Sequence, residues 1–334
     1  GLAQQFRKRK RSVGFFKPIG PKAARVDDAY ADEEAVLFKK ALRLAEPLAT
    51  ICPVVLSDSA LADLLRGRGE GARERILSAY KAAARGKSVM VCAGMGRLSA
   101  GTALGYPMSQ FVEDVQARVV AVERFTWPLE TLDGILEMKA RVPDRFAGVV
   151  FNRVPEALAP QIEQAVRPFL RARGVDVLGV IPQDAVLSAI PVSDLVATLG
   201  AKVLCGADKL ENLVEHFSIG AMTVDAALPH FRRYPNKAVI VGGDRADIQL
   251  AALETSTRCL ILTGDLYPNA RILARAEEAG VPVILAPMET SAAAEACDQL
   301  HGWLSLHNAA KIARATTLVA QRLDWEMLNH NLAR

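Results

Sequence analysis

The chain has 334 residues, of which 51% are hydrophobic and 6% aromatic, a composition typical of an α/β protein rich in Ala, Val and Leu. This length can bury large cores and suggests two domains, and the composition excludes a disordered chain. The formal net charge of +4 is too small for this length to indicate nucleic-acid binding in general.

Residues 1–7 have the composition of a helix already under way, with no capping residue ahead of it. We therefore expect that the chain is truncated before Gly1. The basic run at residues 7–11 would lie at the carboxyl end of this helix, where the helix dipole favours cations. A solvated helix end accounts for the run, and contact with nucleic acid or an anionic membrane is the alternative. We expect neither of these two as a partner.

A strand follows directly and ends in Lys17-Pro-Ile-Gly20. Later segments accompany this string, namely a helix at residues 75–80, a strand ending in Phe151-Asn152-Arg-Val-Pro155, and a strand ending in Ile181-Pro182. Together, residues 1–188 resemble the dethiobiotin synthetase-like branch of P-loop NTPases. That branch includes the cobyrinate amide synthetases and the amino-terminal domain of long bacterial phosphate acetyltransferases. The resemblance implies an ATP and Mg site to which Lys17, Asn152 and Pro182 belong, with Asn152 helping to hold the adenine.

Most of the family's catalytic elements have no counterpart in this chain. The P-loop, whose backbone N–H groups and lysine surround the phosphates, would lie before Gly1. The tripeptide Gly86-Lys87-Ser88 precedes a strand instead of following one, and is better explained as a turn. Ala93 stands where the family has a magnesium-binding glutamate. Asp27 and Asp28 remain as candidate metal ligands, with solvated loop carboxylates as the alternative.

The segment at residues 94–101 follows a strand and contains three glycines. It lacks the third glycine of the dinucleotide-binding fingerprint, because Ser99 occupies that position. A mobile loop over the carboxyl edge of the sheet is the simpler interpretation.

The second half of the chain predicts three buried strands, at residues 238–241, 259–262 and 281–287. The first two are unbroken apolar runs, as expected for parallel strands covered on both faces. Residues 247–256 and 269–279 suit crossover helices, and Gly280 can end the second one. Such sheets bind ligands at the carboxyl ends of their strands, where a Gly-Asp-Arg and a Thr-Gly-Asp group both fall.

These groups resemble a known module. The string Gly243-Asp244-Arg245, the string Leu262-Thr263-Gly264 and the Gly-Val-Pro-Val turn at residues 280–283 are similar to the DRTGG domain, a small α/β regulatory module. The likeness covers residues 192–296 and implies a dimer. The second glycine expected after Leu-Thr-Gly is Asp265, whose carboxylate would repel an anionic ligand or bind a cation.

We predict that a small anionic or nucleotide ligand lies between Asp244, Arg245 and the pair Thr263 and Gly264. Arg245 would pair with its charge, and backbone N–H groups near the glycines would approach it. The alternative is that Asp244 and Arg245 cap the following helix and form an internal ion pair.

Residues 306–332 carry apolar or small residues at helical spacing. Self-packing or a dimer contact explains this stripe better than a dedicated docking helix. The five cysteines are far apart and indicate reduced thiols, and no apolar segment is long enough to span a bilayer. No signal peptide is evident, so we expect a soluble cytoplasmic protein. Scattered histidines and the lack of a Gly-x-Ser-x-Gly motif leave no evident metal site or nucleophile.

The sequence thus predicts two doubly wound, mostly parallel α/β domains, residues 1–190 of the P-loop type without its first strand, and residues 191–334 of the DRTGG type. One hypothesis is a regulatory, ligand-sensing or assembly protein, homodimeric and without catalytic competence. The other is an ATP-dependent ligase or amidotransferase-like enzyme truncated before its P-loop.

Overall fold

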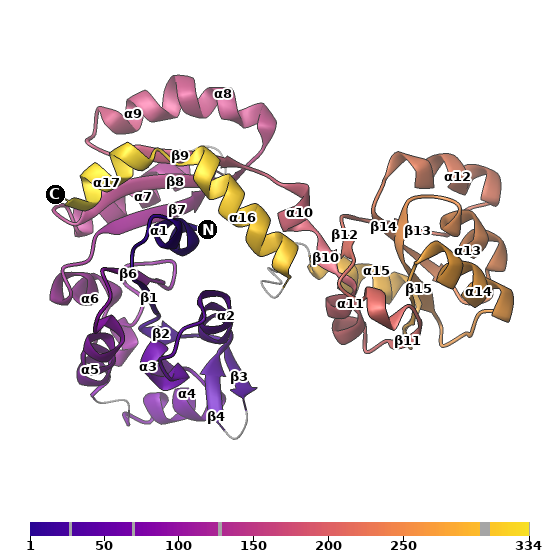
Figure 1. The fold of residues 1–334 in the computed structure, drawn as a ribbon, viewed down its shortest axis with the longest axis horizontal. Coiled ribbons are helices and arrows are strands. Elements are labelled where there is room, and N and C mark those ends of the chain that lie inside the picture. The colour runs from indigo at the N-terminus through magenta and orange to yellow at the C-terminus, as the bar shows by residue number, and fades with distance from the viewer. Residues whose placement is uncertain (27–28, 69–70, 126–128, 301–307, 334) are drawn as a thin grey trace. The chain divides into compact units, whose positions relative to one another are not determined.

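The computed structural model describes residues 1–26, 29–68, 71–125, 129–300 and 308–333. The chain divides into two compact units (Figure 1). Unit 1 comprises Gly1–Gln183 together with Ala315–Arg334, and unit 2 comprises Asp184–Arg314. Each unit is an α/β structure dominated by parallel strands, which confirms the predicted fold class.

The strands of unit 1 form several short ladders. The first half of the unit contains β1 (Val13–Phe16) parallel to β6 (Val89–Cys92), β2 (Ile19–Gly20) parallel to β5 (Val54–Val55), and the hairpin of β3 (Ala23–Val26) and β4 (Ala29–Asp32). The second half contains a three-stranded parallel sheet of β7 (Val119–Arg124), β8 (Phe146–Val154) and β9 (Val177–Pro182).

Helices surround these strands, and most of them bury apolar side chains. They are α1 (Leu2–Lys8), α2 (Glu33–Leu42), α3 (Leu48–Ile51), α4 (Asp58–Leu65), α5 (Ala72–Ala84), α6 (Met108–Asp114), α7 (Leu129–Arg141), α8 (Ala159–Gln161) and α9 (Arg167–Arg171). A π-helical turn, Ile162–Val166, joins α8 to α9. As predicted, α1 ends with basic residues in its last turn, and Arg9 beyond it stacks over the Trp325 ring, 3.9 Å from the centroid.

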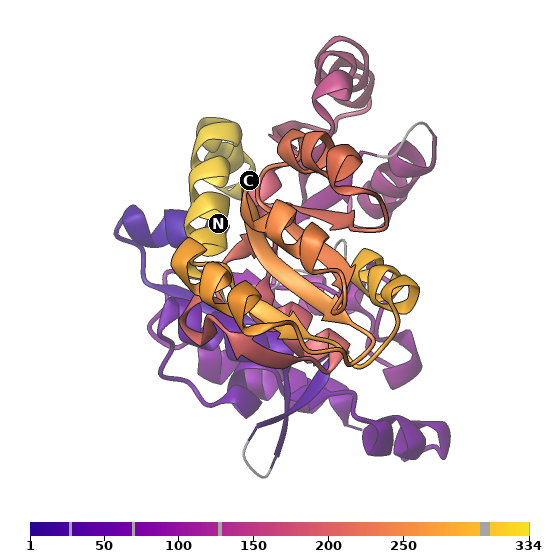
Figure 2. The same cartoon turned by 90° about the vertical axis from the view of Figure 1, so that its right-hand side faces the viewer.

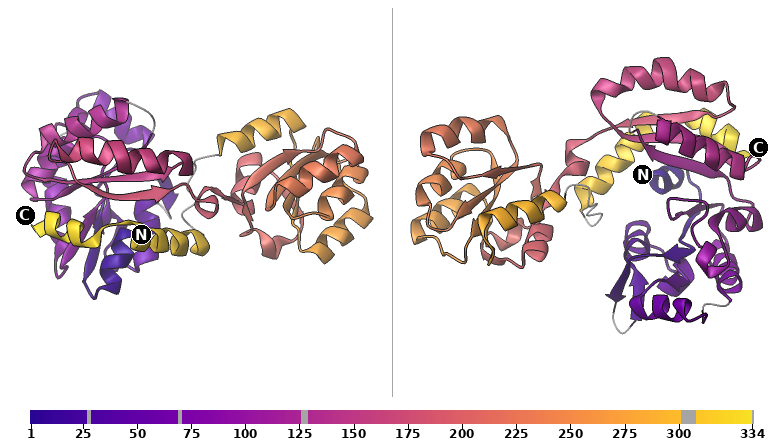
Figure 3. Two further views of the ribbon diagram at one scale, coloured as in Figure 1. Left: turned by 90° about the horizontal axis from the view of Figure 1, so that it is seen from above. Right: turned by 180° about the vertical axis from the view of Figure 1, so that it is seen from behind.

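The carboxyl-terminal segment packs on unit 1, whereas the sequence analysis grouped it with the second domain. α16 (Ala309–Arg322) begins in unit 2 and ends in unit 1, and α17 (Trp325–Ala333) lies beside β9 (Figure 3). Asn331 Nδ2 donates to Ala147 O and to Asp176 Oδ2, both at 2.8 Å. The end of α16 can come close to β9 because β9 has glycine at position 179, where a Cβ would lie 2.6 Å from Arg322 O. Unit 2 is therefore inserted into unit 1.

The two ends of unit 2 meet at an ion pair. Arg314 Nε lies 2.7 Å from Asp184 Oδ2, and the Asp184 side chain is only 8% exposed. Asp184 also caps α10 (Ala185–Ser188) by accepting from Leu187 N. One bond thus joins the first and last residues of the inserted unit.

Unit 2 is built on a five-stranded sheet with the order β11-β16-β15-β14-β13 (Figure 2). β13 (His216–Ile219), β14 (Lys237–Gly242), β15 (Thr257–Thr263) and β16 (Val283–Leu285) are parallel, and β11 (Lys202–Cys205) is antiparallel to β16. A small antiparallel pair, β10 (Ile190–Pro191) and β12 (Leu213–Val214), forms a separate ladder and packs against this sheet. The three strands predicted from their apolar runs are confirmed.

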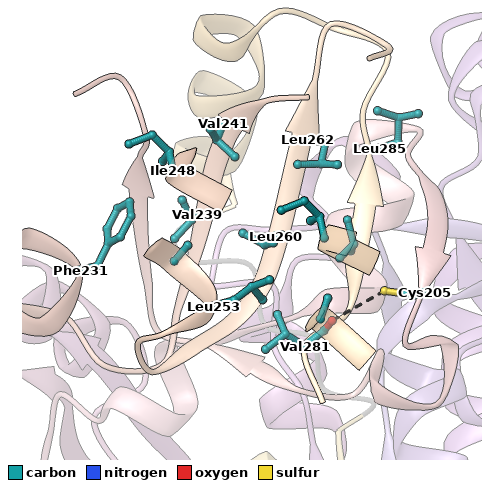
Figure 4. Packing of buried hydrophobic residues seen from close by; sticks show 14 of the residues in the cluster. Cys205, Phe231, Val239, Val241, Ile248, Leu253, Leu260, Leu262, Val281 and Leu285 are labelled. Atoms are coloured by element: carbon teal, nitrogen blue, oxygen red, sulfur yellow. Dashed lines mark hydrogen bonds between the residues drawn. The ribbon is translucent and has the colours of Figure 1, made fainter. Parts of the chain in front are cut away.

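The central strands of unit 2 are covered on both faces. On one face, Val239, Leu260 and Val283 belong to a core closed by α12 (Val224–Arg233), α13 (Ala246–Leu253) and α14 (Ala270–Ala279) (Figure 4). On the other, Ile240 and Ile261 belong to a core closed by α11 (Val192–Leu199) and α15 (Thr290–Gln299). Successive residues of a strand point to opposite faces of the sheet. Because both faces are covered by helices, successive residues must both be apolar.

Lys237, at the start of β14, is fully buried. Its Nζ donates to Thr255 Oγ1 at 2.8 Å and to Ser256 O at 3.2 Å, and lies 5.6 Å from the centroid of the Phe231 ring. No carboxylate among the described residues forms an ion pair with it. Burial lowers the pKa of Lys237 to about 8.

This lowered pKa predicts a pH-dependent stability. The unfolded chain keeps the Lys237 proton up to about pH 10, so between the folded and unfolded pKa values the unfolded state binds more protons and stability rises with pH. We expect the unfolding free energy of the wild type, relative to Lys237→Met, to rise by up to about 1.4 kcal/mol per pH unit above about pH 8. Denaturant titrations at several pH values measure this difference. The exposed Lys202→Met serves as control, and a pH-independent difference for Lys237→Met would contradict the lowered pKa.

Candidate functional site

Lys17, which directly follows β1, lies in a closed cluster of charges. The side chain is 3% exposed, and its Nζ is 2.9 Å from Asp32 Oδ1 and also hydrogen bonds to Glu34. Burial acts to lower the pKa of Lys17, but the hydrogen bonds and charges of Glu34 and Asp32 outweigh it and raise the pKa. Two carboxylates therefore already neutralise the cation that the resemblance assigns to a nucleotide site.

The sequence analysis did not identify Asp32 and Glu34 as partners of Lys17. Asp32 is fully buried and caps α2, accepting from Glu34 N and Ala35 N at 3.1 Å each. Gly20 is needed beside it, because a Cβ there would lie 2.4 Å from Asp32 Cβ. The acidic start of α2 was the available signal, since Asp is a favoured N-cap and acids favour the first turn.

The predicted metal ligands cannot be placed. Asp27 and Asp28 lie outside the described residues. Within the part of the chain that the structure describes, no three His, Cys, Asp or Glu side chains are grouped so that they could hold a metal ion. Cys92, at the end of β6, is not a ready nucleophile, because burial raises the pKa of its thiol to about 12.

Two neighbouring cavities lie at the carboxyl ends of β6 and β7. The larger, of about 940 Å³, is lined by the loop of residues 96–99, by Glu123 and Arg124, and by α7. The smaller, of about 410 Å³, is lined by residues 92–98 and by β7. Among the described residues β6 pairs only with β1, and β7 only with β8. The cavities thus occupy the position where doubly wound sheets bind ligands.

Asn152 and Pro182 lie near the same edge, on adjacent strands. Asn152 stands opposite Arg124 of β7, and its Oδ1 accepts from Arg153 N at 3.0 Å. Pro182 stands opposite Val154. Lys17 directly follows β1, which pairs with β6, and its backbone N–H donates to Ile51 O at 2.8 Å.

In unit 2, the Arg245 guanidinium is engaged within the protein. Arg245 Nε and Nη2 each lie 3.1 Å from a different oxygen of Asp247, and Nη2 also donates to Met222 O at 3.1 Å. The hydrogen bond with Asp247 raises the pKa of Arg245. The internal ion pair considered from the sequence is therefore formed, but with Asp247 and not with Asp244.

Thr263 and Gly264 form a tightly packed strand end. Thr263 is 2% exposed, and its Oγ1 is 2.7 Å from Thr290 Oγ1. Gly264 and Asp265 have φ of 76° and 55°, so both are left-handed. Asp265 thus takes a conformation that glycine adopts at lower cost, which explains why the resembling family has glycine there.

The loop after β14 depends on a glycine and on a glutamine. A Cβ at Gly243 would lie 1.7 Å from Leu266 O, so only glycine fits. Gln249 is fully buried, and its Nε2 donates to Gly242 O at 2.9 Å and to Gly243 O at 3.1 Å. The sequence analysis did not single out Gln249, because its role depends on loop carbonyls that have no sequence signal.

Two linked α/β units built mainly of parallel strands, with cavities at the strand ends of unit 1, are the architecture expected of a P-loop-type domain joined to a small α/β module. The chain belongs to the AAA domain family, here of the dethiobiotin synthetase-like P-loop type, whose model matches residues 1–191. Residues 194–300 match the DRTGG domain. This is the domain arrangement of the amino-terminal part of long bacterial phosphate acetyltransferases.

Curated relatives agree with this assignment. A phosphate acetyltransferase of Synechocystis sp. is 27% identical over 319 residues, covering 91% of this chain and 43% of that protein. A phosphate acetyltransferase of Nitratidesulfovibrio vulgaris is 28% identical over 195 residues, covering 55% of this chain and 27% of that protein. The chain therefore spans less than half the length of either relative.

Among solved structures, the chain is similar to the CBS and DRTGG domains of the regulatory region of Clostridium perfringens pyrophosphatase, which was crystallised with its activator, diadenosine tetraphosphate. The sequence identity is 18%, the TM-score is 0.32, and the match covers 48% of this chain and 75% of that chain. A likeness at this level does not bear on the ligand of this chain.

The Lys17 cluster predicts unequal costs for its members. Lys17→Met would leave the fully buried Asp32 carboxylate without its cation, and we expect a loss of about 3 kcal/mol or more in unfolding free energy. Glu34→Gln should cost less than about 1 kcal/mol, because the Glu34 side chain is 44% exposed. Chemical denaturation of both variants measures the difference. Equal, small losses would show that the cluster is not a buried ion pair.

Proposed function

We propose that this chain is a regulatory, ligand-sensing and assembly protein without phosphoryl-transfer activity of its own. We propose that its role corresponds to that of the amino-terminal part of the phosphate acetyltransferases to which it is similar. The observation that carries the proposal is the state of Lys17, whose charge is held between Asp32 and Glu34. A lysine so committed cannot meet a phosphate without breaking a buried pair.

The sequence around β6 supports the same proposal. Ala93 follows this strand where the family has a magnesium-binding glutamate, and a methyl group cannot ligate a cation. Lys87 of the Gly-Lys-Ser string precedes β6, and its Nζ lies 2.7 Å from Glu46 Oε1. Lys87 therefore lies in a turn and forms an ion pair within the protein, which differs from the position of a P-loop lysine. ATP and Mg remain cofactors to be tested in unit 1.

In unit 2, we place a small anionic or nucleotide ligand beside Asp244, Arg245, Thr263 and Gly264. Opening of the exposed Arg245 pair would free a guanidinium at this edge. Three large apolar side chains near the same strand ends are exposed, namely Ile219, Leu266 and Tyr267. They support homodimer formation through this unit, since clustered exposed apolar groups mark interaction surfaces.

We also propose a cytoplasmic location, supported by five free thiols, most of them buried. Among the described helices, none is both long and apolar enough to cross a membrane.

A second candidate function is an ATP-dependent ligase or amidotransferase-like enzyme. One observation favours it: β6 and β7 both line the smaller cavity, and each has only one ladder partner among the described strands. If the natural polypeptide carries a glycine-rich Gly-Lys-Ser/Thr loop ahead of Gly1, a strand leading to that loop would fit between them. The coding sequence upstream of Gly1 tests this condition directly.

Hydrolysis of ATP separates the two functions. We expect the 334-residue chain to hydrolyse Mg-ATP no faster than a heat-treated sample, because it has neither phosphate-binding loop nor metal carboxylate at β6. Phosphate release measured with and without magnesium provides the test. Turnover at about 1 s⁻¹, an ordinary enzyme rate, would overturn the regulatory proposal.

Ligand sensing by unit 2 is tested at Arg245. We expect nucleotides that raise the melting temperature of the wild type to raise it less in Arg245→Ala, because the variant lacks the proposed anion partner. Arg275→Ala is a matched control, since Arg275 forms a similar surface ion pair with Glu278. Thermal-shift titrations of the three proteins compare the responses. An unchanged response in Arg245→Ala would remove this residue from the site.

A further inference from the structure

Basic side chains gather at the amino ends of β1 and β6 in unit 1. They are exposed and come from three segments, namely the end of α1 with the turn after it, the end of α2 and the end of α5. We call this surface the basic patch. It consists of Arg7, Lys8, Arg9, Lys10, Arg11, Arg43 and Arg85.

Hydrogen bonds hold the three segments of the basic patch side by side. Arg7 Nη1 donates to Leu42 O at 3.1 Å, which joins α1 to the end of α2. Ser12 Oγ donates to Gly86 O at 3.0 Å, which joins the turn after α1 to the end of α5. Ser88 Oγ donates to Ser12 O at 3.1 Å and strengthens the same connection. The seven charges therefore share one surface although they are spread over 79 positions of the sequence, from residue 7 to residue 85.

The basic patch has no acidic partner within the described part of the chain. None of its side chains forms an ion pair with a described residue. Glu46, in the neighbouring loop, already pairs with Lys87. The whole sequence has 41 basic and 37 acidic residues, so without these seven it would have 34 basic and 37 acidic ones. The positive net charge of the chain is thus accounted for by this patch.

The helix dipole explains only part of this charge. Cations are favoured in the last turn of a helix, where Arg7 and Lys8 lie, and the effect fades beyond that turn. Lys10 and Arg43 have φ of 59° and 47°, left-handed conformations that glycine adopts at lower cost. In contrast, α11 and α14 end in left-handed glycines. The chain keeps a basic side chain at two positions where the backbone favours glycine, and such departures from local preference are expected at functional surfaces.

We propose that the basic patch docks an acidic segment of a partner protein. Most of its members are arginines, whose guanidinium groups donate two parallel hydrogen bonds to a carboxylate. None of the large exposed apolar side chains in the described part of the chain belongs to the patch. It therefore offers no apolar anchor for a membrane and no exposed aromatic ring on which nucleic-acid bases could stack. This surface lies in unit 1 and is independent of the ligand proposed for unit 2.

A labelled oligoglutamate peptide is the probe, titrated with the full chain and followed by fluorescence anisotropy. We expect saturable binding that weakens as sodium chloride is added, because salt screens exposed charges. Lys10→Gly and Arg43→Gly should each weaken binding about threefold, the change expected for loss of one exposed ion pair. Arg153→Gly is the matched control, because it also removes a positive charge from a left-handed position, with φ of 57°, but lies in β8 outside the patch.

A second readout separates binding from folding. Lys10→Gly and Arg43→Gly should melt no lower than the wild type, because glycine suits a left-handed backbone, so their weaker binding cannot be attributed to unfolding.

The proposal is overturned if the wild type binds oligoglutamate no better than oligoglutamine, or if Arg153→Gly loses as much affinity as Lys10→Gly. Tighter binding of oligouridylate or of phosphatidylserine vesicles than of oligoglutamate would also overturn it, and would assign the patch to nucleic acid or to a membrane surface. The peptide is titrated without nucleotide, and its binding should persist in Arg245→Ala. Failure of this surface and failure of the unit 2 site can therefore be told apart.

Discussion

Burial of parallel strands on both faces is the constraint on which this structure depends. Where a strand such as β14 has helices on each side, its interior positions must all be apolar, and polar groups can stand only at its ends. Lys237 shows the cost at the amino end, where a buried cation has its pKa lowered to about 8. At the carboxyl ends, loops and cavities provide room for charge, and the candidate sites of both units are found there.

The positive charges at these ends differ in how fully they are already used. Lys17 is surrounded by carboxylates in a buried cluster, and Arg245 is held by Asp247 at the surface. Arg124 and Arg153, in contrast, have no acidic partner among the described residues. A family resemblance points to positions, but the neighbours of each charge decide whether it can meet a ligand.

Three strands of unit 2, β14, β15 and β16, could be predicted from the sequence, because a short apolar run between glycine and charged residues fits few structures other than a buried strand. The partners of Lys17 could not be predicted from the sequence. Asp32 comes close to Lys17 only when β3 and β4 pair, and no motif in the sequence indicates that pairing. The ion-pair partner of Arg245 is Asp247 and not Asp244, because side-chain rotamers decide between carboxylates that lie one and two residues away. The left-handed backbone of Arg153 in β8 likewise could not be predicted, because no glycine marks the position.

The insertion of unit 2 has a consequence for the order of folding during synthesis. Asp184 and Arg314 close unit 2 upon itself, so this unit can form once residue 314 has left the ribosome. Unit 1 must wait longer, because Ala147 of β8 receives its hydrogen bond from Asn331, 184 residues further along the chain. The inserted module is therefore complete before the sheet of its host is covered, and the nascent host sheet stays open while unit 2 matures.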